Sequence, residues 1–304
     1  MACAKRKKLL LIFNPKSGVQ NFPGQLFEVV NKFTEAGFLV TVYPTQAPGD
    51  VARIITDYAE NYGCLVCSGG DGTVSEALDS LMSMEKRPVF GLIPSGTVND
   101  YASSLGIPKD IPVATDIVTG GTVSALDIGC FGGKYFSYVA AFGGLTDVPY
   151  ATPQNAKNLF GKLAYLIEGI KRFGSARSST CKITLDGETL QGDFVLGIVG
   201  NAHSIAGIRL PTEMGIQMDD GLFEVILVRA PHSLKDHQEI ISSLLIQEPR
   251  TDLLTIRKAK KVEFVSAEEV AWTLDGDFGG KYAEVAIENI WRAFHVLTPT
   301  SDRL

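Results

Sequence analysis

A glycine-rich stretch around Asp71 carries residues whose types and spacing suit phosphate binding. The apolar run 64–67 predicts a buried strand, and residues 69–72, Gly-Gly-Asp-Gly, predict a tight turn before a helix over 74–84. Glycines let a ligand approach the backbone, and the first turn of a helix offers unpaired N–H groups. Together these features predict a phosphate site.

Asp71 adds a requirement for a cation at this turn. A carboxylate repels a phosphate unless a cation lies between them, and Mg²⁺ usually binds through one or two carboxylates plus substrate phosphates. Thr73 and Glu76 have the spacing of a capping box, which predicts that the helix begins here. The alternative is a glycine-rich turn in which Asp71 only caps the backbone, and this turn alone does not separate the two.

Two further loops have a similar composition. Residues 14–18, Asn-Pro-Lys-Ser-Gly, follow the apolar run 9–13, and residues 94–100, Pro-Ser-Gly-Thr-Val-Asn-Asp, follow a strand predicted over 88–93. Each loop thus comes directly after a short apolar strand. In an open α/β sheet, ligands bind beyond the carboxyl ends of the strands, so we expect a nucleotide at these loops.

The elements that must position the loops alternate between strand and helix. Helices are predicted over 23–36 and 50–62, the second capped by Asp50, with a strand over 38–43 between them. This alternation predicts βαβ units and a parallel sheet in a doubly wound α/β domain. We place that domain at residues 1–127 and expect residues 288–304 to join it.

The pattern becomes β-rich after residue 127. An amphipathic helix is predicted over 155–173 and another helix over 234–246, and an apolar segment at 291–297 could be a strand of either domain. Turn residues separate the other short apolar runs, which predicts an antiparallel sandwich or barrel over 128–287. These runs are 181–185, 194–199, 223–228, 253–256, 262–265 and 271–274.

Composition narrows the classes of partner and compartment. A net charge of −6 over 304 residues argues against nucleic acid as the main partner, and no apolar stretch is long enough for a membrane-spanning helix. The odd number of cysteines suggests no disulfide framework, and we expect Cys64 and Cys67 to be buried thiols. These observations favour a reducing, cytoplasmic compartment. Whether the basic cluster at 5–8 contacts a membrane surface is left open.

Three motifs make the chain resemble a known family. Asn14-Pro15-x-Ser17-Gly18, Gly69-Gly70-Asp71-Gly72-Thr73 and Pro94-x-Gly96-Thr97-x-Asn99-Asp100 occur in this order. They resemble the diacylglycerol kinase catalytic-domain family, and more closely its soluble bacterial lipid kinases. Gly-Gly-Asp-Gly alone is shared with NAD kinases and phosphofructokinases, but the three motifs together are specific. The resemblance covers nearly the whole length, since 220–222 and 274–276 also match.

The resemblance implies a fold of the NAD kinase and diacylglycerol kinase type and an ATP-dependent kinase. The substrate would be a hydroxyl of diacylglycerol or a related lipid reached at a membrane surface, on the inner face of the membrane. ATP would lie between the two domains. The residues that would contact it are Asn14, Pro15, Lys16, Ser17, Gly18, Thr45, Gly69, Gly70, Asp71, Gly72, Thr73, Val74, Ser75, Glu76 and Thr97.

The same resemblance implies roles for several acidic residues. Asp71, Asp100 and Asp127 would organise Mg²⁺ and the phosphates. A structural Mg²⁺ would be held by Asp220, with backbone carbonyls at Gln217 and Leu222. The general base that accepts the proton of the lipid hydroxyl would be Asp277.

Alternatives stay open for several of these residues. Asp100 could cap a helix, Asp220 could lie in its turn for backbone reasons, and Glu76 is as consistent with a helix cap as with a ligand contact. Asp277 stands where the family normally has Glu, which shortens its reach by about 1.5 Å, one carbon–carbon step. Ser75 stands where Asn is usual.

Two other functions therefore compete with the lipid kinase. One is a catalytically weak nucleotide-binding regulatory protein, and the other is a kinase of a soluble hydroxyl compound. The identity of the lipid and the oligomeric state, monomer or homodimer, are not readable from the sequence.

Overall fold

The chain forms two compact units. The computed structural model describes residues 7–17, 22–143, 178–205, 208–209, 215–246 and 252–300. One unit comprises the residues up to Ile128 together with those from Trp291 onward, and the other comprises Gly129–Ile290. The chain passes from one unit to the other twice, in the strands β5 (Thr122–Phe131) and β15 (Asp277–Thr298).

A parallel sheet is the centre of the first unit. Its strand order is β2–β1–β3–β4, every neighbouring pair is parallel, and β15 adds a parallel contact to β4 near its C-terminal end. The strands are β1 (Lys7–Phe13), β2 (Phe38–Pro44), β3 (Cys64–Gly69) and β4 (Val89–Pro94). Nearly all of β1 and β3 is buried, as expected for parallel strands covered on both faces.

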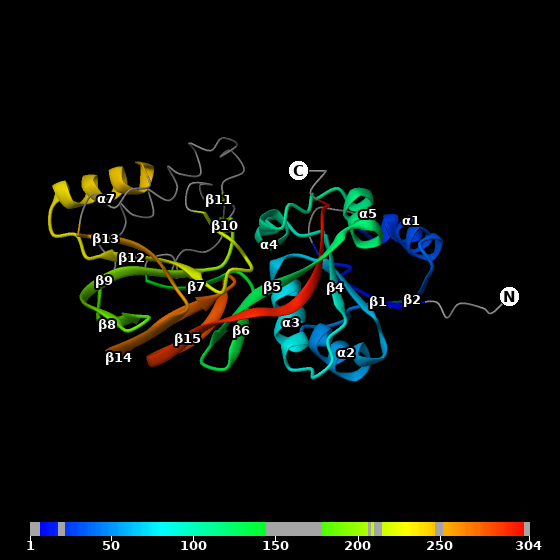
Figure 1. The fold of residues 1–304 in the computed structure, drawn as a ribbon, viewed down its shortest axis with the longest axis horizontal. Coiled ribbons are helices and arrows are strands. Elements are labelled where there is room, and N and C mark those ends of the chain that lie inside the picture. Colours follow the sequence, from blue (N-terminus) through cyan, green and yellow to red (C-terminus); the bar gives the residue numbers. More distant parts are fainter. Residues whose placement is uncertain are drawn as a thin grey trace. The chain divides into compact units, whose positions relative to one another are not determined.

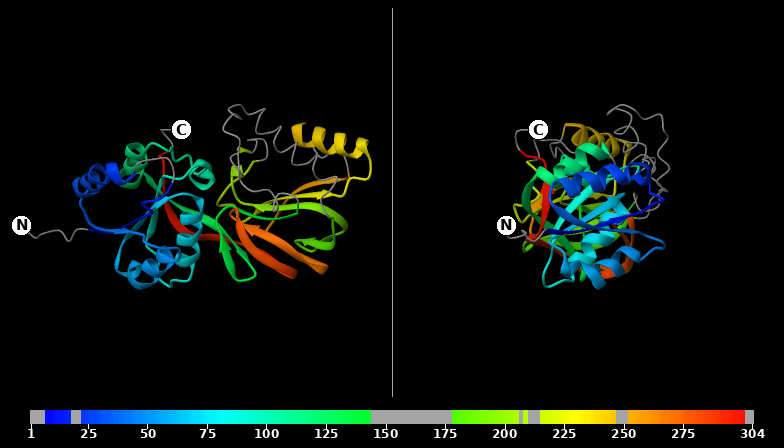
Figure 2. Two further views of the ribbon diagram at one scale, coloured as in Figure 1. Left: turned by 180° about the vertical axis from the view of Figure 1, so that it is seen from behind. Right: turned by 90° about the vertical axis from the view of Figure 1, so that its right-hand side faces the viewer.

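Helices cover both faces of this sheet. Helix α1 packs against α5, and α2 packs against α3; Figure 1 shows the two pairs on opposite faces, and Figure 2 shows the same unit from behind. The bounds are α1 (Phe22–Glu35), α2 (Asp50–Tyr58), the short 3₁₀ helix η1 (Ala59–Asn61), α3 (Asp71–Met82), α4 (Asp100–Ser104) and α5 (Ile111–Gly120). The predicted doubly wound α/β architecture is confirmed.

The thiols of the Cys-x-x-Cys pair lie inside this layer arrangement. Cys64 and Cys67 are both buried and neither forms a disulfide. Burial raises the pKa of Cys64 to about 12 and that of Cys67 further still. The prediction of buried thiols is confirmed, because Cys64 is 4% exposed and Cys67 is 0% exposed.

Antiparallel strands form most of the second unit. The strand order is β13–β12–β9–β7–β14–β15, and β8 pairs with both β9 and β14. The bounds are β6 (Lys134–Phe136), β7 (Val139–Gly143), β8 (Ser179–Leu185), β9 (Glu188–Gly200), β10 (Ser204–Ile205), β11 (Ile208–Arg209), β12 (Phe223–Arg229), α7 (Leu234–Ile246), β13 (Leu254–Ala259) and β14 (Lys261–Leu274). The predicted β-rich character and the helix over 234–246 are confirmed.

An aromatic cluster fills the core between these strands. The ring of Trp272 lies 4.8 Å from that of Phe142, 5.0 Å from that of Phe131 and 5.3 Å from that of Phe264, between centroids. All four side chains are at most 1% exposed. They join segments far apart in the sequence, so burial of these rings stabilises the whole unit.

Two predictions for the second half need correction or lie outside the described residues. The separate strands predicted at 262–265 and 271–274 are one strand, β14, whose register against β15 shifts between Val265 and Val270. An irregularity of this kind interrupts the alternation of apolar residues without ending the strand. The amphipathic helix predicted over 155–173 falls outside the described residues.

Two Asp-Gly turns close hairpins of the second unit. Asp186 and Gly187 join β8 to β9, and Asp275 and Gly276 join β14 to β15, with positive φ angles of 47°, 94°, 51° and 90° in that order. Positive φ at both central residues is the mark of a type I′ turn, for which Asp-Gly is a favoured pair. The first turn is exposed, whereas Asp275 is only 5% exposed.

The buried aspartate ties its turn to the segment before β7. Its carboxylate accepts hydrogen bonds from the backbone N–H groups of Ser137, Tyr138 and Val139 and from the Ser137 hydroxyl, at 2.7–3.1 Å. Burial raises the pKa of Asp275, and these donors act in the opposite direction because they favour the charged form. The turn is thereby fixed at the start of β15.

Asp275→Asn should destabilise the protein by about 2–4 kcal/mol, because one accepting oxygen becomes an NH₂ group that faces N–H donors. Asn still tolerates the left-handed conformation, so the turn itself is not strained. The matched control is Asp186→Asn in the turn of the same type. Asp186 also accepts two backbone N–H groups, from Lys260 and Lys261, but it is exposed, so water can serve a donor that loses its partner and the loss should be less than about 1 kcal/mol. Chemical denaturation measures both, and equal losses would contradict the role given to the buried carboxylate.

Candidate functional site

The predicted nucleotide loops are joined by backbone hydrogen bonds at the strand ends. The N–H of Asn14 donates to the carbonyl of Ser68 (3.1 Å), and the N–H of Ser95 donates to the carbonyl of Gly69 (2.9 Å). The N–H of Thr45 donates to the last residue of β1 at 2.9 Å. The ends of β1, β2, β3 and β4 are thus brought together, as the sequence predicted for parallel strands.

The loop after β1 is a compact turn. The side-chain oxygen of Asn14 accepts from the N–H of Lys16 at 2.9 Å, and the Asn14 carbonyl accepts from the N–H of Ser17 at 3.1 Å. Pro15 and Lys16 are exposed. Gly18, the last predicted residue of this loop, lies outside the described residues.

Glycines are required where the loops after β3 and β4 touch. A Cβ atom added to Gly96 would lie 2.4 Å from the Cα atom of Gly70, and one added to Gly69 would lie 2.5 Å from the Cβ atom of Thr73. Such distances are far shorter than any real contact of a Cβ atom. Gly96 is therefore needed where the two loops pack on each other, and Gly69 is needed where β3 packs on the start of α3.

Asn99 closes the loop after β4. It adopts a left-handed conformation with φ of 60°, and its side-chain oxygen accepts from the N–H of Gly96 at 3.0 Å. Its amide nitrogen donates to the Gly96 carbonyl at 2.6 Å. Thr97 is exposed in this loop, where its carbonyl accepts from the ammonium of Lys109 at 2.7 Å.

Helix α3 begins at Asp71, three residues earlier than the capping-box pattern requires. Gly70 is the N-cap residue and has no side chain with which to cap, so the predicted capping box of Thr73 and Glu76 is wrong. The N–H groups of Gly72 and Thr73 precede the first intrahelical bond, in which Val74 donates to the carbonyl of Gly70 at 3.1 Å. These two N–H groups lie at the N-terminal end of α3, where binding of a phosphate is favoured.

The predicted residues of α3 differ in what they can offer a ligand. Val74 is 2% exposed and its N–H is used within the helix, so it presents neither group to a nucleotide. Ser75 is partly buried. Asp71 accepts from the N–H of Tyr101 through Oδ1 at 3.1 Å, which links the start of α3 to α4.

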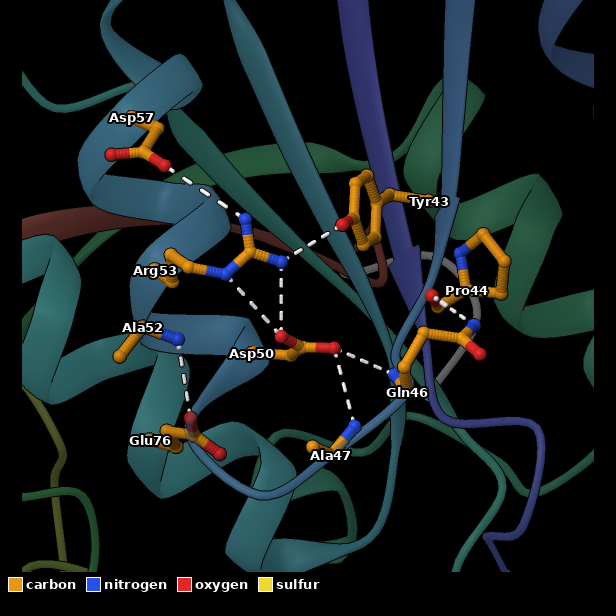
Figure 3. A network of polar contacts seen from close by, with 9 residues as sticks. All are labelled: Tyr43, Pro44, Gln46, Ala47, Asp50, Ala52, Arg53, Asp57 and Glu76. Atoms are coloured by element: carbon orange, nitrogen blue, oxygen red, sulfur yellow. Dashed lines mark hydrogen bonds and ion pairs between the residues drawn. The ribbon is translucent and has the colours of Figure 1, made fainter.

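Glu76 connects α3 to α2 (Figure 3). Its Oε1 atom accepts from the N–H of Ala52 at 3.1 Å, in the first turn of α2. The carboxylate therefore satisfies a backbone donor of a neighbouring helix instead of its own. The prediction that Asp50 caps helix α2 is also wrong. The N-cap residue is Gly49, with φ of 85°, and Asp50 is the first residue of the helix.

Asp50 holds the loop that follows Thr45 (Figure 3). Its Oδ2 atom accepts from the N–H groups of Gln46 (2.6 Å) and Ala47 (3.2 Å), and its Oδ1 atom contacts Arg53. The pKa of Asp50 lies below its usual value because the N–H of Gln46 and the Arg53 guanidinium favour the charged form. Arg53 also donates to the hydroxyl of Tyr43 at 2.8 Å.

The other two predicted carboxylates of this unit are buried. Asp100, in the first turn of α4, is 2% exposed, and Asp127 is 1% exposed. Oδ1 of Asp127 accepts from the N–H of Arg292 at 2.8 Å. Across the described ranges, no three acidic, histidine or cysteine side chains gather as a metal-binding group. The donor set fits a Mg²⁺ ion held by Asp71 together with phosphates, which is the usual arrangement for this metal.

The predicted structural metal site of the second unit has different surroundings. Oδ1 of Asp220 accepts from the N–H of Leu222 at 3.0 Å, and Oδ2 lies 2.9 Å from the ammonium of Lys258. Gln217 is exposed. The same ammonium lies 3.4 Å from Glu224, whose pKa burial raises to about 7. An ammonium already neutralises the carboxylate here, so the residues do not fit the predicted Mg²⁺.

Sequence reasoning missed Lys258. It lies in a half-buried strand without a motif, and only its charge within the run 254–259 could have drawn attention to it.

Asp277 is the first residue of β15, directly after the buried Asp-Gly turn. It pairs with Leu274 across the hairpin and is exposed. Within the described residues its carboxylate makes no hydrogen bond or ion pair. The hydrogen bonds that fix the local turn are made by Asp275, and in the part of the chain that the structure describes none joins the Asp277 carboxylate to the backbone around it.

Comparison with known proteins identifies close relatives over nearly the full length. The sequence pattern of the diacylglycerol kinase catalytic domain matches residues 8–131. Diacylglycerol kinase of Bacillus subtilis (strain 168) is 31% identical over 296 residues, with 96% of this chain and 97% of that protein covered. Diacylglycerol kinase of Staphylococcus carnosus (strain TM300) is 34% identical over 299 residues, covering 97% and 96%.

Solved structures give the same result. The crystal structure of a diacylglycerol kinase from Bacillus anthracis (strain Sterne) superimposes with a TM-score of 0.76 at 25% identity, covering 97% of this chain and 98% of that one. The sequence resemblance and the predicted two-part fold therefore agree with independent structural evidence.

Gly96→Ala should lower the stability by about 1–3 kcal/mol, because the new methyl group overlaps the backbone of Gly70 and forces the two loops apart. Gly120→Ala is the matched control in the same unit, since an added Cβ atom meets nothing within 4 Å there. Thermal unfolding should show a loss for the first variant and none for the second. Equal melting temperatures would show that the loops do not need this contact.

Proposed function

The chain belongs to the diacylglycerol kinase catalytic-domain family, and from this premise we propose that it transfers the γ-phosphate of ATP to a hydroxyl of diacylglycerol or a related lipid. Family membership supports the reaction class, since relatives named diacylglycerol kinase are similar over nearly the whole chain. The choice of lipid is our inference from those names, and any lipid with an accessible hydroxyl belongs to the same chemical class.

The observation that carries the proposal is the joined set of strand-end loops. Hydrogen bonds connect the loops after β1, β3 and β4, and the start of α3 presents the N–H groups of Gly72 and Thr73 at the same edge. An anion binds favourably at such a helix end. The turn at Asn14 and the hydroxyls of Thr45 and Thr97 come from neighbouring loops, and we assign them to nucleotide contacts.

Asp71 is proposed to position the nucleotide-bound Mg²⁺. Its Oδ1 atom is held by the N–H of Tyr101, which orients the carboxylate at the start of α3. When bound, the metal ion neutralises negative charge on the phosphates. Phosphoryl transfer needs little covalent chemistry from the protein, so orientation and charge neutralisation supply most of the rate.

Asp277 is proposed to accept the proton of the lipid hydroxyl. A general base needs an accessible carboxylate that is not already engaged, and Asp277 is exposed at the rigid start of β15. The neighbouring Phe278 side chain is 71% exposed, which suits a site that receives an apolar substrate. Substitution of Asp277 measures how far its carboxylate reaches toward the lipid hydroxyl.

The lipid is proposed to be taken from a membrane surface on the cytoplasmic side. Diacylglycerol resides in bilayers, so the enzyme must meet it there. In the parts of the chain that the structure describes, none of the helices has the length and apolar character needed to cross a bilayer. A peripheral association with the membrane is part of the same proposal, because the diacylglycerol substrate lies in a bilayer.

Incubation with γ-labelled ATP, Mg²⁺ and vesicles that contain diacylglycerol should move label into the organic phase. Asp71→Asn should slow this transfer by about 10²-fold or more, because the charge that positions the metal is lost. Asp57→Asn, an exposed aspartate of α2, is the control and should keep the parent rate. Label that enters only water-soluble products would favour a kinase of a soluble compound, and no transfer at all would favour the regulatory protein.

Asp277→Asn should reduce kcat by about 10²–10⁴-fold while the KM for ATP stays nearly constant, since proton acceptance is needed only in the transition state. Asp277→Glu should raise kcat if the backbone has the geometry that suits Glu, and lower it if the turn has moved inward. Steady-state kinetics of the three forms decide this. Equal rates for Asp, Asn and Glu would show that residue 277 is not the base.

A further inference from the structure

The ammonium of Lys258 lies beside Asp220, the carboxylate for which the family resemblance implies a bound Mg²⁺ ion. It is 2.8 Å from the carbonyl oxygen of Gly215, 2.9 Å from Oδ2 of Asp220 and 3.4 Å from Oε1 of Glu224. A lysine ammonium has three N–H donors, so the number of neighbouring oxygens equals the number of donors. One nitrogen from β13 thus connects the segment before β12 with β12 itself.

The Lys258 ammonium stabilises Glu224 more than it stabilises Asp220 or the Gly215 carbonyl. Its side chain is 5% exposed, and neither carboxylate oxygen has a hydrogen-bond partner among the described residues apart from the ion-pair contact with Lys258. A buried carboxylate is strongly destabilising unless a positive charge lies next to it. Lys258 is directly opposite Glu224 in the β12–β13 register, and Gly200, on the other side in β9, adds no side chain.

Both carboxylate oxygens of Asp220 already have partners. Its Oδ1 atom accepts from the N–H of Leu222 at 3.0 Å, and its Oδ2 atom receives the ammonium. A divalent ion on this carboxylate would stand within a few ångströms of the ammonium, where two like charges repel strongly in a partly buried place. Mg²⁺ also demands near-ideal octahedral geometry, which one engaged carboxylate does not provide.

We propose that the ammonium of Lys258 replaces a structural Mg²⁺ ion at Asp220. The turn before β12 is then held by an internal cluster of one ammonium and two carboxylates. This proposal is independent of the lipid kinase reaction, because it concerns the stability of the second unit without nucleotide. It separates the two metal requirements that the sequence predicts: Mg²⁺ acts with the nucleotide, and no second ion stabilises the fold.

The first test compares the parent protein with Asp220→Asn, both without nucleotide. Melting temperatures are measured in EDTA and in millimolar Mg²⁺, and the difference is the response to Mg²⁺. We expect the same response in both proteins, since any binding elsewhere contributes equally to each. A response that is larger in the parent than in Asp220→Asn would show a metal on this carboxylate and would overturn the proposal.

The second test removes the ammonium. Lys258→Met keeps the apolar stem, and in EDTA it should melt at least about 3 °C below the matched control Lys261→Met. Lys261 also contacts two glutamates, at 2.9 Å and 3.5 Å, but its partners are half exposed. Mg²⁺ should restore part of the loss in Lys258→Met alone, because two carboxylates are then available. Equal melting temperatures of the two variants in EDTA would contradict the proposal, and if Lys258→Met does not fold, the Asp220→Asn comparison decides.

Discussion

The contact between the backbones of Gly70 and Gly96 sets the geometry of the first unit. These residues follow β3 and β4, two neighbouring parallel strands whose ends lie in register, so the loops that leave them must cross at one edge. No side chain fits on Gly96 in that crossing, because a Cβ atom there would lie 2.4 Å from the Cα atom of Gly70. Helix α3 begins directly after Gly70, and the Asn99 turn begins directly after Gly96. The position of the helix end and its N–H groups therefore depends on a contact that only glycine permits.

Much of this arrangement could be predicted because short-range patterns and the rules of parallel sheets point the same way. The apolar runs gave the positions of β1, β3 and β4, and the requirement that parallel strands end at one edge brought their loops together. The residues at which the helices begin were predicted less accurately. Glu76 has the spacing of a cap, but its carboxylate turns to the N–H of Ala52 in another helix. A local pattern does not contain that tertiary partner.

The second unit shows the same limit more clearly. The two Asp-Gly turns look alike in sequence and share a backbone conformation, yet only Asp275 is buried and accepts four hydrogen bonds. Those donors come from residues about 140 positions earlier in the chain. Likewise, Lys258 becomes a cation for two carboxylates only because β13 pairs with β12. Burial and long-range strand pairing determine these roles, and neither can be recognised from a local sequence motif.

The way each carboxylate is held determines whether it can also bind a cation. Asp71 and Glu76 each give one oxygen to a backbone N–H of a neighbouring helix, and among the described residues no hydrogen bond to the other oxygen is found. One oxygen is oriented by a backbone donor, which leaves the second for the metal contact that we propose for Asp71. Asp275 and Asp220 have both oxygens engaged. Such a carboxylate stabilises a turn but offers little to Mg²⁺. The backbone donors around an aspartate, more than the motif that contains it, thus separate the residues that maintain the fold from those that suit the Mg²⁺ role we propose.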